Sequence, residues 1–246
     1  MTELKYRNEL ELRLSQFLPG ATLAIQTLPQ VPVIRLQLLA DTMSARQLPH
    51  EVAARVMEDP LYWVFCWASG QVLASWLLQD TRRVKGKRVL DFGSGSGVVA
   101  IAAARAGAHE VIACDCDPLA RTAIAANAKL NGVDLTVAAD FEEVSGELDL
   151  LVAADVLYDA DNLALLSAFT KRASSVLVAD SRVRNFQIAP YRKIHQADSR
   201  TLPDLGESAE FNRVSLYEAI NDEPGNDVPG DDESGNDEPA NQEAAT

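Results

Sequence analysis

The sequence predicts an α/β fold with a doubly wound, mostly parallel sheet. From residue 88 onward, short apolar runs alternate with helix-length segments, which is the order expected of strands joined by right-handed helical crossovers. Two helix boundaries are marked by Gly107, which follows one helical segment, and by Pro118, which begins the next. The chain has 246 residues, 47% of them hydrophobic, which is long enough for one sizeable domain of this class and short for two.

The core elements follow one another along the chain. Strands are expected at 88–92, 110–114, 134–138, 148–154 and 175–180, with helices between them at 97–106, 118–130 and 161–172. A helical segment near 184–193 is expected next, followed by a strand pair at 198–202 and 211–219. Such a pair is compatible with an antiparallel addition, so the expected sheet is mixed, has seven strands and ends on an antiparallel strand.

The chain before this core predicts a short extension. The elements expected there are an amphipathic helix over 3–18, an edge-like strand over 33–39, an irregular or weakly helical stretch over 40–60 and a helix over 69–79. Pro19 and Gly20 end the first helix. We expect residues 1–80 to form an N-terminal helical and strand extension that packs on a core of residues 81–220.

Residues 221–246 differ in composition from the rest of the chain. They form acidic pentads rich in Pro and Gly, with nine acids and no Lys or Arg. Almost no apolar side chain is present to offset the ordering entropy, which predicts a disordered tail. The formal net charge is -14, so the other 220 residues carry only -5. This mild charge, without a basic cluster, argues against a nucleic-acid surface.

Cysteine usage and hydropathy indicate a cytoplasmic protein. Cys66, Cys114 and Cys116 are odd in number and lack paired spacing, which suits a reducing compartment. A zinc site at the CxC pair lacks nearby partner ligands, so no metal is expected. The N-terminus does not resemble a signal peptide, and the chain lacks an apolar run of about 18 residues, so no membrane segment is expected. We also expect a monomer.

A glycine-rich turn is the main functional signal. The motif DFGSGSG, residues 91–97, follows the first core strand and precedes a helix, as nucleoside-binding turns do. Asp91 stands where diphosphate-binding folds usually have an apolar or small residue, and it would repel a diphosphate by on the order of several kcal/mol. S-adenosylmethionine has an ammonium group beside a sulfonium and no phosphate. The charge therefore favours this cofactor over NAD.

Two further acids lie at the ends of the next strands. Asp115 follows Gly97 by the length of one helix and one strand, a position that suits a ribose contact. Asp117, before Pro118, is expected to cap the next helix. Asp140 ends the third strand, where it suits an adenine amino group, with Phe141 packing on the ring. A turn-forming role is the alternative for Asp140.

Three motifs in this order and spacing resemble a known family. DFGSGSG, ACDCDPLA at 113–120 and AADVLYD at 153–159 resemble the class I, seven-strand, Rossmann-like S-adenosylmethionine-dependent methyltransferases. The segments 31–39 and 59–73, with the DxxY motif, narrow the resemblance to protein-lysine methyltransferases of the family-16 group. Within that group the closest branch acts on the electron transfer flavoprotein β subunit. The resemblance covers roughly residues 31–219.

The resemblance implies roles for individual residues. Those expected to bind the cofactor are Trp67, Ser69, Gly70, Asp91, Gly93, Ser94, Gly95, Gly97, Asp115, Cys116, Asp140, Phe141 and Asp155. Asp155 and Tyr158 occupy the DxxY position, where the family holds the methyl acceptor, and are the expected catalytic residues. The alternative for Tyr158 is a cap of the strand.

The motif at the fourth core strand bears on the acceptor. Amide- and adenine-directed methyltransferases of this fold carry Asn-Pro-Pro-Tyr there, whereas a carboxylate at Asp155 suits an amine. We therefore expect a protein-lysine N-methyltransferase whose partner is a protein presenting a lysine. The alternatives are a methyltransferase acting on the ribosomal large-subunit stalk protein or on a small amine or pyridine-type molecule, an NAD-dependent oxidoreductase, and a catalytically silent cofactor-binding protein.

Overall fold

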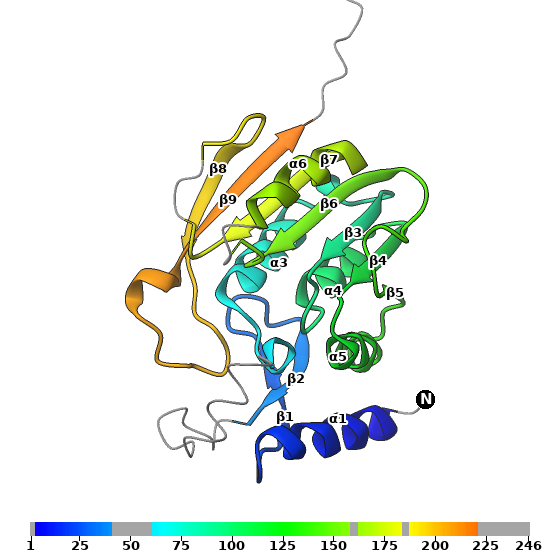
Figure 1. Ribbon diagram of the computed structural model, residues 1–246, viewed down its shortest axis with the longest axis vertical. Helices are drawn as coiled ribbons and strands as arrows, with labels where there is room; N and C mark the ends of the chain where they lie inside the picture. Colours follow the sequence, from blue (N-terminus) through cyan, green and yellow to red (C-terminus); the bar gives the residue numbers. More distant parts are fainter. Residues whose placement is uncertain (1–2, 41–60, 158–161, 184–186, 221–246) are drawn as a thin grey trace, which may run out of the picture.

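The computed structural model describes residues 3–40, 61–157, 162–183 and 187–220 (Figure 1). The helices are α1 (Glu3–Phe17), α3 (Ala68–Gln79), α4 (Val98–Arg105), α5 (Pro118–Leu130) and α6 (Leu163–Arg172), with the short 3-10 helices η2 (Tyr62–Val64), η3 (Thr81–Arg83) and η5 (Ala209–Asn212). The strands are β1 (Leu23–Thr27), β2 (Arg35–Leu39), β3 (Arg88–Phe92), β4 (Glu110–Cys114), β5 (Thr136–Ala138), β6 (Leu148–Ala154), β7 (Ala173–Asp180), β8 (Arg192–Asp198) and β9 (Arg213–Ile220). The acidic tail lies outside the described residues.

A seven-stranded sheet forms the centre of the molecule, in the order β5-β4-β3-β6-β7-β9-β8. The strands β3 to β7 pair in parallel. β9 pairs antiparallel with both β7 and β8. The predicted doubly wound, mixed sheet with an antiparallel last strand is confirmed.

The central strands divide their side chains between two hydrophobic layers, because successive residues of a strand point to opposite faces. Val89 of β3 belongs to the layer that contains residues of α3 and α4. The next residue, Leu90, belongs to the layer that contains Phe169 of α6. Helices therefore cover both faces of the sheet (Figure 1), as crossovers between parallel strands require.

α1 packs against α5, where Leu10 and Leu14 of α1 are fully buried beside Ala120 and Ala123 of α5. The small alanine side chains allow the two helices to approach closely. α3, which the sequence analysis assigned to the N-terminal extension, packs on α4 and on the sheet. The division of the chain at residue 80 remains a prediction.

Asn127 of α5 and Asn131, which caps the end of that helix, bind the free edge of β2. Asn127 Oδ1 accepts a hydrogen bond from Gln37 N at 2.7 Å. Asn131 Oδ1 accepts one from Arg35 N at 3.1 Å, and its Nδ2 donates to Arg35 O at 2.6 Å. These bonds satisfy backbone groups that an edge strand leaves unpaired. The β1–β2 hairpin is thereby attached to the helix that follows β4.

Two predictions near the C-terminal end are wrong. The described residues of the segment 184–193 form no helix, and β8 begins at Arg192. The strand predicted at 198–202 lies instead at Arg192–Asp198. β8 is an edge strand whose side chains are all at least partly exposed, so it lacks the apolar alternation by which strands are found in a sequence. None of the described helices is long and apolar enough to cross a membrane.

Candidate functional site

The glycine turn, Asp115, Asp140 and Asp155 lie at the edge of the sheet where the parallel strands end. Strand order reverses between β3 and β6, because β3 continues to β4 and β5 on one side while β6 continues to β7 on the other. Ligands of doubly wound sheets bind at the carboxyl ends of the strands beside this switch point. The glycine turn follows β3 and Asp155 follows β6, so the two flank it.

The turn after β3 depends on its glycines. Gly93, Gly95 and Gly97 have φ angles of 66°, 54° and 85°, in the left-handed region that favours glycine. A Cβ atom on Gly93 would lie 2.9 Å from Val156 Cγ1, so a side chain does not fit between this turn and the loop after β6. The exposed backbone of such a turn lets a nucleoside cofactor approach closely.

Asp91 lies at the end of β3 and is only 2% exposed. Its Oδ2 accepts hydrogen bonds from Ser94 Oγ at 2.6 Å and from Ala100 N of α4 at 3.0 Å. Burial raises the pKa of Asp91 to about 7, against the opposing effect of these bonds. A cationic ligand group at this turn would favour the ionised carboxylate, whereas a phosphate would disfavour it.

The glycine turn and the start of α5 hold Asp115. Its Oδ2 accepts from Gly95 N at 2.8 Å, and its Oδ1 accepts from Asp117 N at 3.0 Å. Burial raises the pKa of Asp115 above its ordinary value. Asp117 caps α5, as predicted, by accepting from Leu119 N at 2.8 Å. The exposed Cys116 lies between these two acids.

Asp140 and Phe141 follow β5. Asp140 is exposed, and its Oδ1 accepts from Glu142 N at 2.9 Å, which is the turn-forming alternative. Phe141 is 7% exposed. Its ring lies 5.5 Å from that of Phe92 and 6.0 Å from that of Phe169, centroid to centroid. An adenine at this position would contact only the small exposed part of the Phe141 ring.

The carboxylate of Asp155 connects three segments. Its Oδ1 accepts from Ser69 Oγ at 2.6 Å, from Ser181 Oγ at 2.8 Å and from Ser181 N at 3.1 Å, and its Oδ2 accepts from Ser69 N at 3.1 Å. Asp155 has a φ of 53°, a conformation uncommon outside glycine and frequent at functional sites. The start of α3 is thus joined to the ends of β6 and β7. Tyr158 lies outside the described residues.

The three predicted residues around the start of α3 differ in their surroundings. Ser69 is fully buried and donates to Asp155. Gly70 is buried against α4, where an added Cβ would lie 2.9 Å from Val98 Cγ1. Trp67 is partly exposed, and its Nε1 donates to Tyr62 O at 3.1 Å. Of these three residues, only Trp67 presents side-chain surface to a ligand.

The end of β7 and the loop that follows it contain an acid that was not among the predicted site residues. Asp180 is 1% exposed, and its Oδ1 accepts from Arg182 N at 2.8 Å and from Val183 N at 2.7 Å. Burial, with the charge of the nearby Asp155, raises the pKa of Asp180 to about 6. An acid that ends a buried apolar run, here VLVAD at 176–180, is the signal that identified Asp115. It would also have pointed to this loop.

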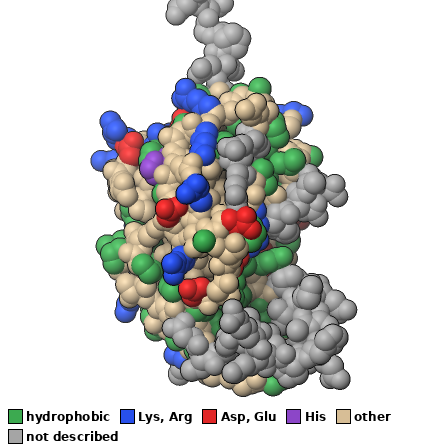
Figure 2. Space-filling model, turned by 90° about the vertical axis from the view of Figure 1, so that its left-hand side faces the viewer, with side chains coloured by type: hydrophobic (Ala, Val, Ile, Leu, Met, Phe, Trp, Pro, Cys, Tyr) green, Lys and Arg blue, Asp and Glu red, His purple; other side chains and the backbone are tan. Residues whose placement is uncertain are grey.

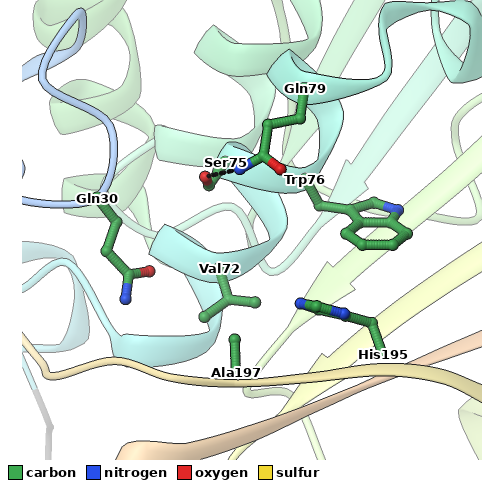
Figure 3. A pocket seen from close by; sticks show the side chains of 7 residues that line it. All are labelled: Gln30, Val72, Ser75, Trp76, Gln79, His195 and Ala197. Carbon is green, nitrogen blue, oxygen red and sulfur yellow. Dashed lines mark hydrogen bonds between the residues drawn. The ribbon is translucent and has the colours of Figure 1, made fainter.

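A pocket of about 280 Å³ lies between α3 and β8. It is lined by Gln30, Val72, Ser75, Trp76, Gln79, His195 and Ala197 (Figure 3). The rings of Trp76 and His195 lie 4.5 Å apart on one side of it. None of its lining residues belongs to the predicted site, so it is not the candidate active site. In the part of the chain that the structure describes, no three His, Cys, Asp or Glu side chains are grouped as metal ligands would be.

Comparisons with known proteins show which family this chain resembles. Residues 74–178 match the family model described as ribosomal protein L11 methyltransferase. The electron transfer flavoprotein beta subunit lysine methyltransferase of Rattus norvegicus is 33% identical over 204 residues, 79% of this chain and 79% of that protein. The enzyme of the same name from Mus musculus is 37% identical over 155 residues, 59% of this chain and 60% of the mouse protein.

A bacterial relative and a solved structure lie further away. The ribosomal protein L11 methyltransferase of Aliivibrio salmonicida is 32% identical over 181 residues, 70% of this chain and 59% of that protein. The structure of a T. thermophilus 16S rRNA methyltransferase has a TM-score of 0.52 at 14% identity, and covers 81% of this chain and 50% of the other. That structure supports the fold alone.

The residues at the sheet edge fit S-adenosylmethionine. The glycine turn leaves its backbone open to close contact, and the carboxyl groups of Asp91 and Asp115 are of the chemical kind that pairs with an ammonium and with ribose hydroxyls. The chain therefore belongs to the class I S-adenosylmethionine-dependent methyltransferases, in the family that contains the electron transfer flavoprotein β-subunit lysine methyltransferases.

Proposed function

We propose that this enzyme is a protein-lysine N-methyltransferase whose acceptor resembles the electron transfer flavoprotein β subunit. The observation that carries the proposal is the similarity to the rat enzyme over 79% of both chains, since that enzyme is named for this acceptor. Asp155 at the end of β6 adds support, because a carboxylate attracts an approaching ammonium group.

S-adenosylmethionine supplies a methyl group already activated by a sulfonium. In our proposal the glycine turn and Asp91 hold its methionine end, Asp115 holds the ribose, and Asp140 with Phe141 borders the adenine. The chain's own residues then contribute binding, alignment with the acceptor and exclusion of water, which are the main requirements of an in-line transfer.

The acceptor amine must lose a proton before it reacts. An ordinary lysine pKa of about 10.4 makes this cost roughly 4–5 kcal/mol at pH 7. Entry into a less solvated site lowers that pKa. Asp155 Oδ2 accepts one hydrogen bond from the protein, whereas Oδ1 accepts three, so Oδ2 keeps capacity for the incoming ammonium. We propose that the proton leaves to water through Asp155 or Tyr158.

A transfer assay tests this function. Purified enzyme, methyl-labelled S-adenosylmethionine and a purified electron transfer flavoprotein β subunit are incubated, and the labelled residue is identified by mass spectrometry. We expect label on lysine, no transfer by Asp115→Ala, and cofactor binding without transfer by Asp155→Ala. Full transfer by Asp155→Ala, with Asp115→Ala inactive, would exclude the acceptor role of Asp155.

Ribosomal protein L11 is the second candidate acceptor. The match of residues 74–178 to the L11 methyltransferase model favours it. Against it, the match to the Aliivibrio salmonicida enzyme covers 70% of this chain and 59% of that protein, whereas the match to the rat enzyme covers 79% of both. Purified L11 in the same assay separates the two acceptors, and a panel of small amines follows if neither protein is labelled.

Calorimetry distinguishes a methyltransferase from an NAD-dependent oxidoreductase and from a catalytically silent protein. We expect the enzyme to bind S-adenosylmethionine and not NAD, because Asp91 would repel a diphosphate. Binding of NAD alone would indicate an oxidoreductase. Binding of S-adenosylmethionine without transfer to any protein or amine would indicate a silent cofactor-binding protein.

We also infer a monomeric, cytoplasmic protein that does not bind nucleic acid. The free thiols of Cys66, Cys114 and Cys116 support a reducing compartment. On the face that carries β8 and the loop after it, Lys and Arg side chains are interspersed with Asp and Glu (Figure 2). Phosphate binding requires concentrated positive charge. Light scattering and an RNA gel-shift assay test the monomer and the absence of nucleic-acid binding.

A further inference from the structure

The connection between β8 and β9 folds back onto the start of α3. We call this connection, residues 199–212, the β8–β9 loop. Cys66 and Leu202 pair as an isolated antiparallel bridge, with N–O distances of 2.7 and 2.8 Å. Gln71 Nε2 of α3 donates to Arg200 O at 2.6 Å. The loop is therefore held next to Trp67 by two backbone hydrogen bonds and by the side chain of Gln71.

Arg182, from the loop after β7, joins this assembly with its side chain. Its guanidinium carbon lies 4.6 Å from the ring centre of Phe211 and 5.9 Å from that of Trp67. Its Nη2 donates to Glu207 Oε1 at 2.7 Å, and Glu207 Oε2 accepts from Thr201 Oγ1 at 2.8 Å. Stacking on aromatic rings and pairing with a carboxylate are interactions that a planar guanidinium makes better than an ammonium group.

This assembly includes Trp67, one of the expected cofactor residues, but otherwise lies on the opposite side of the switch point from the cofactor residues at the ends of β3, β4 and β5. The expected cofactor residues of the sheet edge, apart from Asp155, follow β3, β4 and β5, whereas Arg182 follows β7. Arg182 is also adjacent to Ser181, which donates to Asp155 through both N and Oγ. If the cofactor binds at the ends of β3, β4 and β5 as proposed, Arg182, Glu207 and the β8–β9 loop lie on the side of the site that is left for the methyl acceptor.

We propose that Arg182 is a positioning residue for the methyl acceptor. It fastens the β8–β9 loop to Trp67 through Phe211 and Glu207, and the fastened loop forms the acceptor-side wall of the site. The inference rests on the proposed function, since it assumes that the acceptor is a protein. It assigns acceptor recognition, and not cofactor binding, to Arg182, Glu207 and Phe211, which lie outside the three sequence motifs of the family.

Steady-state kinetics with Arg182→Met test the proposal. We expect KM for the purified electron transfer flavoprotein β subunit to rise about tenfold, which is the loss of about 1.4 kcal/mol of binding, while kcat and the Kd for S-adenosylmethionine stay within about twofold. Arg182→Lys should restore little of the lost affinity, because lysine lacks the planar guanidinium group that stacks on rings and pairs with a carboxylate. Glu207→Gln should raise KM as well, and the double variant should show less than the sum of the two effects in free energy.

Arg200→Met is the matched control. Arg200 lies in the same loop, but its side chain is 73% exposed and 3.8 Å from Asp204. Such exposed pairs contribute little, so KM should not change. A KM of Arg182→Met within about twofold of wild type, or a parallel rise in the cofactor Kd, would overturn the proposal, since a tenfold effect is expected.

A second readout does not depend on activity. Loosening of the β8–β9 loop should accelerate tryptic cleavage after Arg200 in Arg182→Met, at unchanged cofactor affinity. An unchanged cleavage rate would overturn the proposal even if no acceptor were found. Failure of the proposed function is distinguishable, because it appears as an absence of transfer by the wild-type enzyme to every protein offered.

Discussion

Replacement of Asp155 by Asn is expected to loosen three segments at once. The Asp155 carboxylate accepts four hydrogen bonds, all from Ser69 and Ser181. Asn has the same size and tolerates the left-handed φ of 53°, so the backbone itself adds little cost. When the side-chain oxygen of the introduced Asn faces Ser181, however, its NH₂ group faces the backbone N–H of Ser69, so two hydrogen-bond donors oppose each other.

The expected loss of stability follows from the hydrogen bonds of Asp155 that the substitution removes or weakens. A hydrogen bond to a charged group is worth about 1.5–3 kcal/mol. One such bond is lost in Asp155→Asn, and the other three become bonds to a neutral acceptor. Because Asp155 is partly exposed, we expect about 2 kcal/mol of lost stability. For a domain of this length that corresponds to a Tm lower by about 4–8 °C.

Thermal unfolding without cofactor, followed by circular dichroism, measures this shift. Asp140→Asn is the matched control, since the Asp140 side chain is exposed and its one bond to Glu142 N can also be made by Asn. Its Tm should stay close to wild type, as is usual for surface substitutions. A Tm of Asp155→Asn within about 1 °C of wild type would refute the inference that this carboxylate joins the segments.

Three further variants test other parts of the site. Burial raises the pKa of Asp91 from 3.8 to about 7, so the folded chain keeps a proton that the unfolded chain releases, and the free energy of unfolding falls as pH rises between these values. Urea unfolding at pH 5 and at pH 8 should therefore show a smaller loss of stability for Asp91→Asn than for wild type. An equal loss in the two proteins would contradict this prediction. Gly70→Ala places a Cβ 2.9 Å from Val98 Cγ1, so it should lower stability by about 1–3 kcal/mol despite a gain in helix propensity of about 1 kcal/mol. Val98→Ala removes the methyl group that the new Cβ would contact, so it should restore the thermal stability of Gly70→Ala. A Tm of Gly70→Ala above that of wild type would show that the packing between Gly70 and Val98 is loose. Asp115→Ala should weaken S-adenosylmethionine binding at least about tenfold in calorimetry, and an unchanged Kd would remove Asp115 from the cofactor site.

The core of the fold was predictable because its signals are local. The strands β3, β4 and β6 are apolar runs, and Gly107 and Pro118 mark helix ends within a few residues of chain. β8 was not predictable in the same way. Five of its seven residues are polar or charged and all are at least partly exposed, and they form a strand because β9 lies beside them. That pairing is decided by the position of the whole sheet and not by the segment itself.

The sequence by itself determined which acids and glycines lie at the sheet edge. Asp115 and Asp155 directly follow the buried strands β4 and β6, and Asp91 is the last residue but one of β3, so the strands themselves place these acids at that edge. Only the tertiary structure decided what each side chain contacts. Ser69 and Ser181 occupy the Asp155 carboxylate, and Arg182 reaches Glu207, because α3, β7 and the β8–β9 loop converge from distant parts of the chain. Hydrogen bonds and ring contacts act over a few ångströms in space, and distance along the chain does not reveal them.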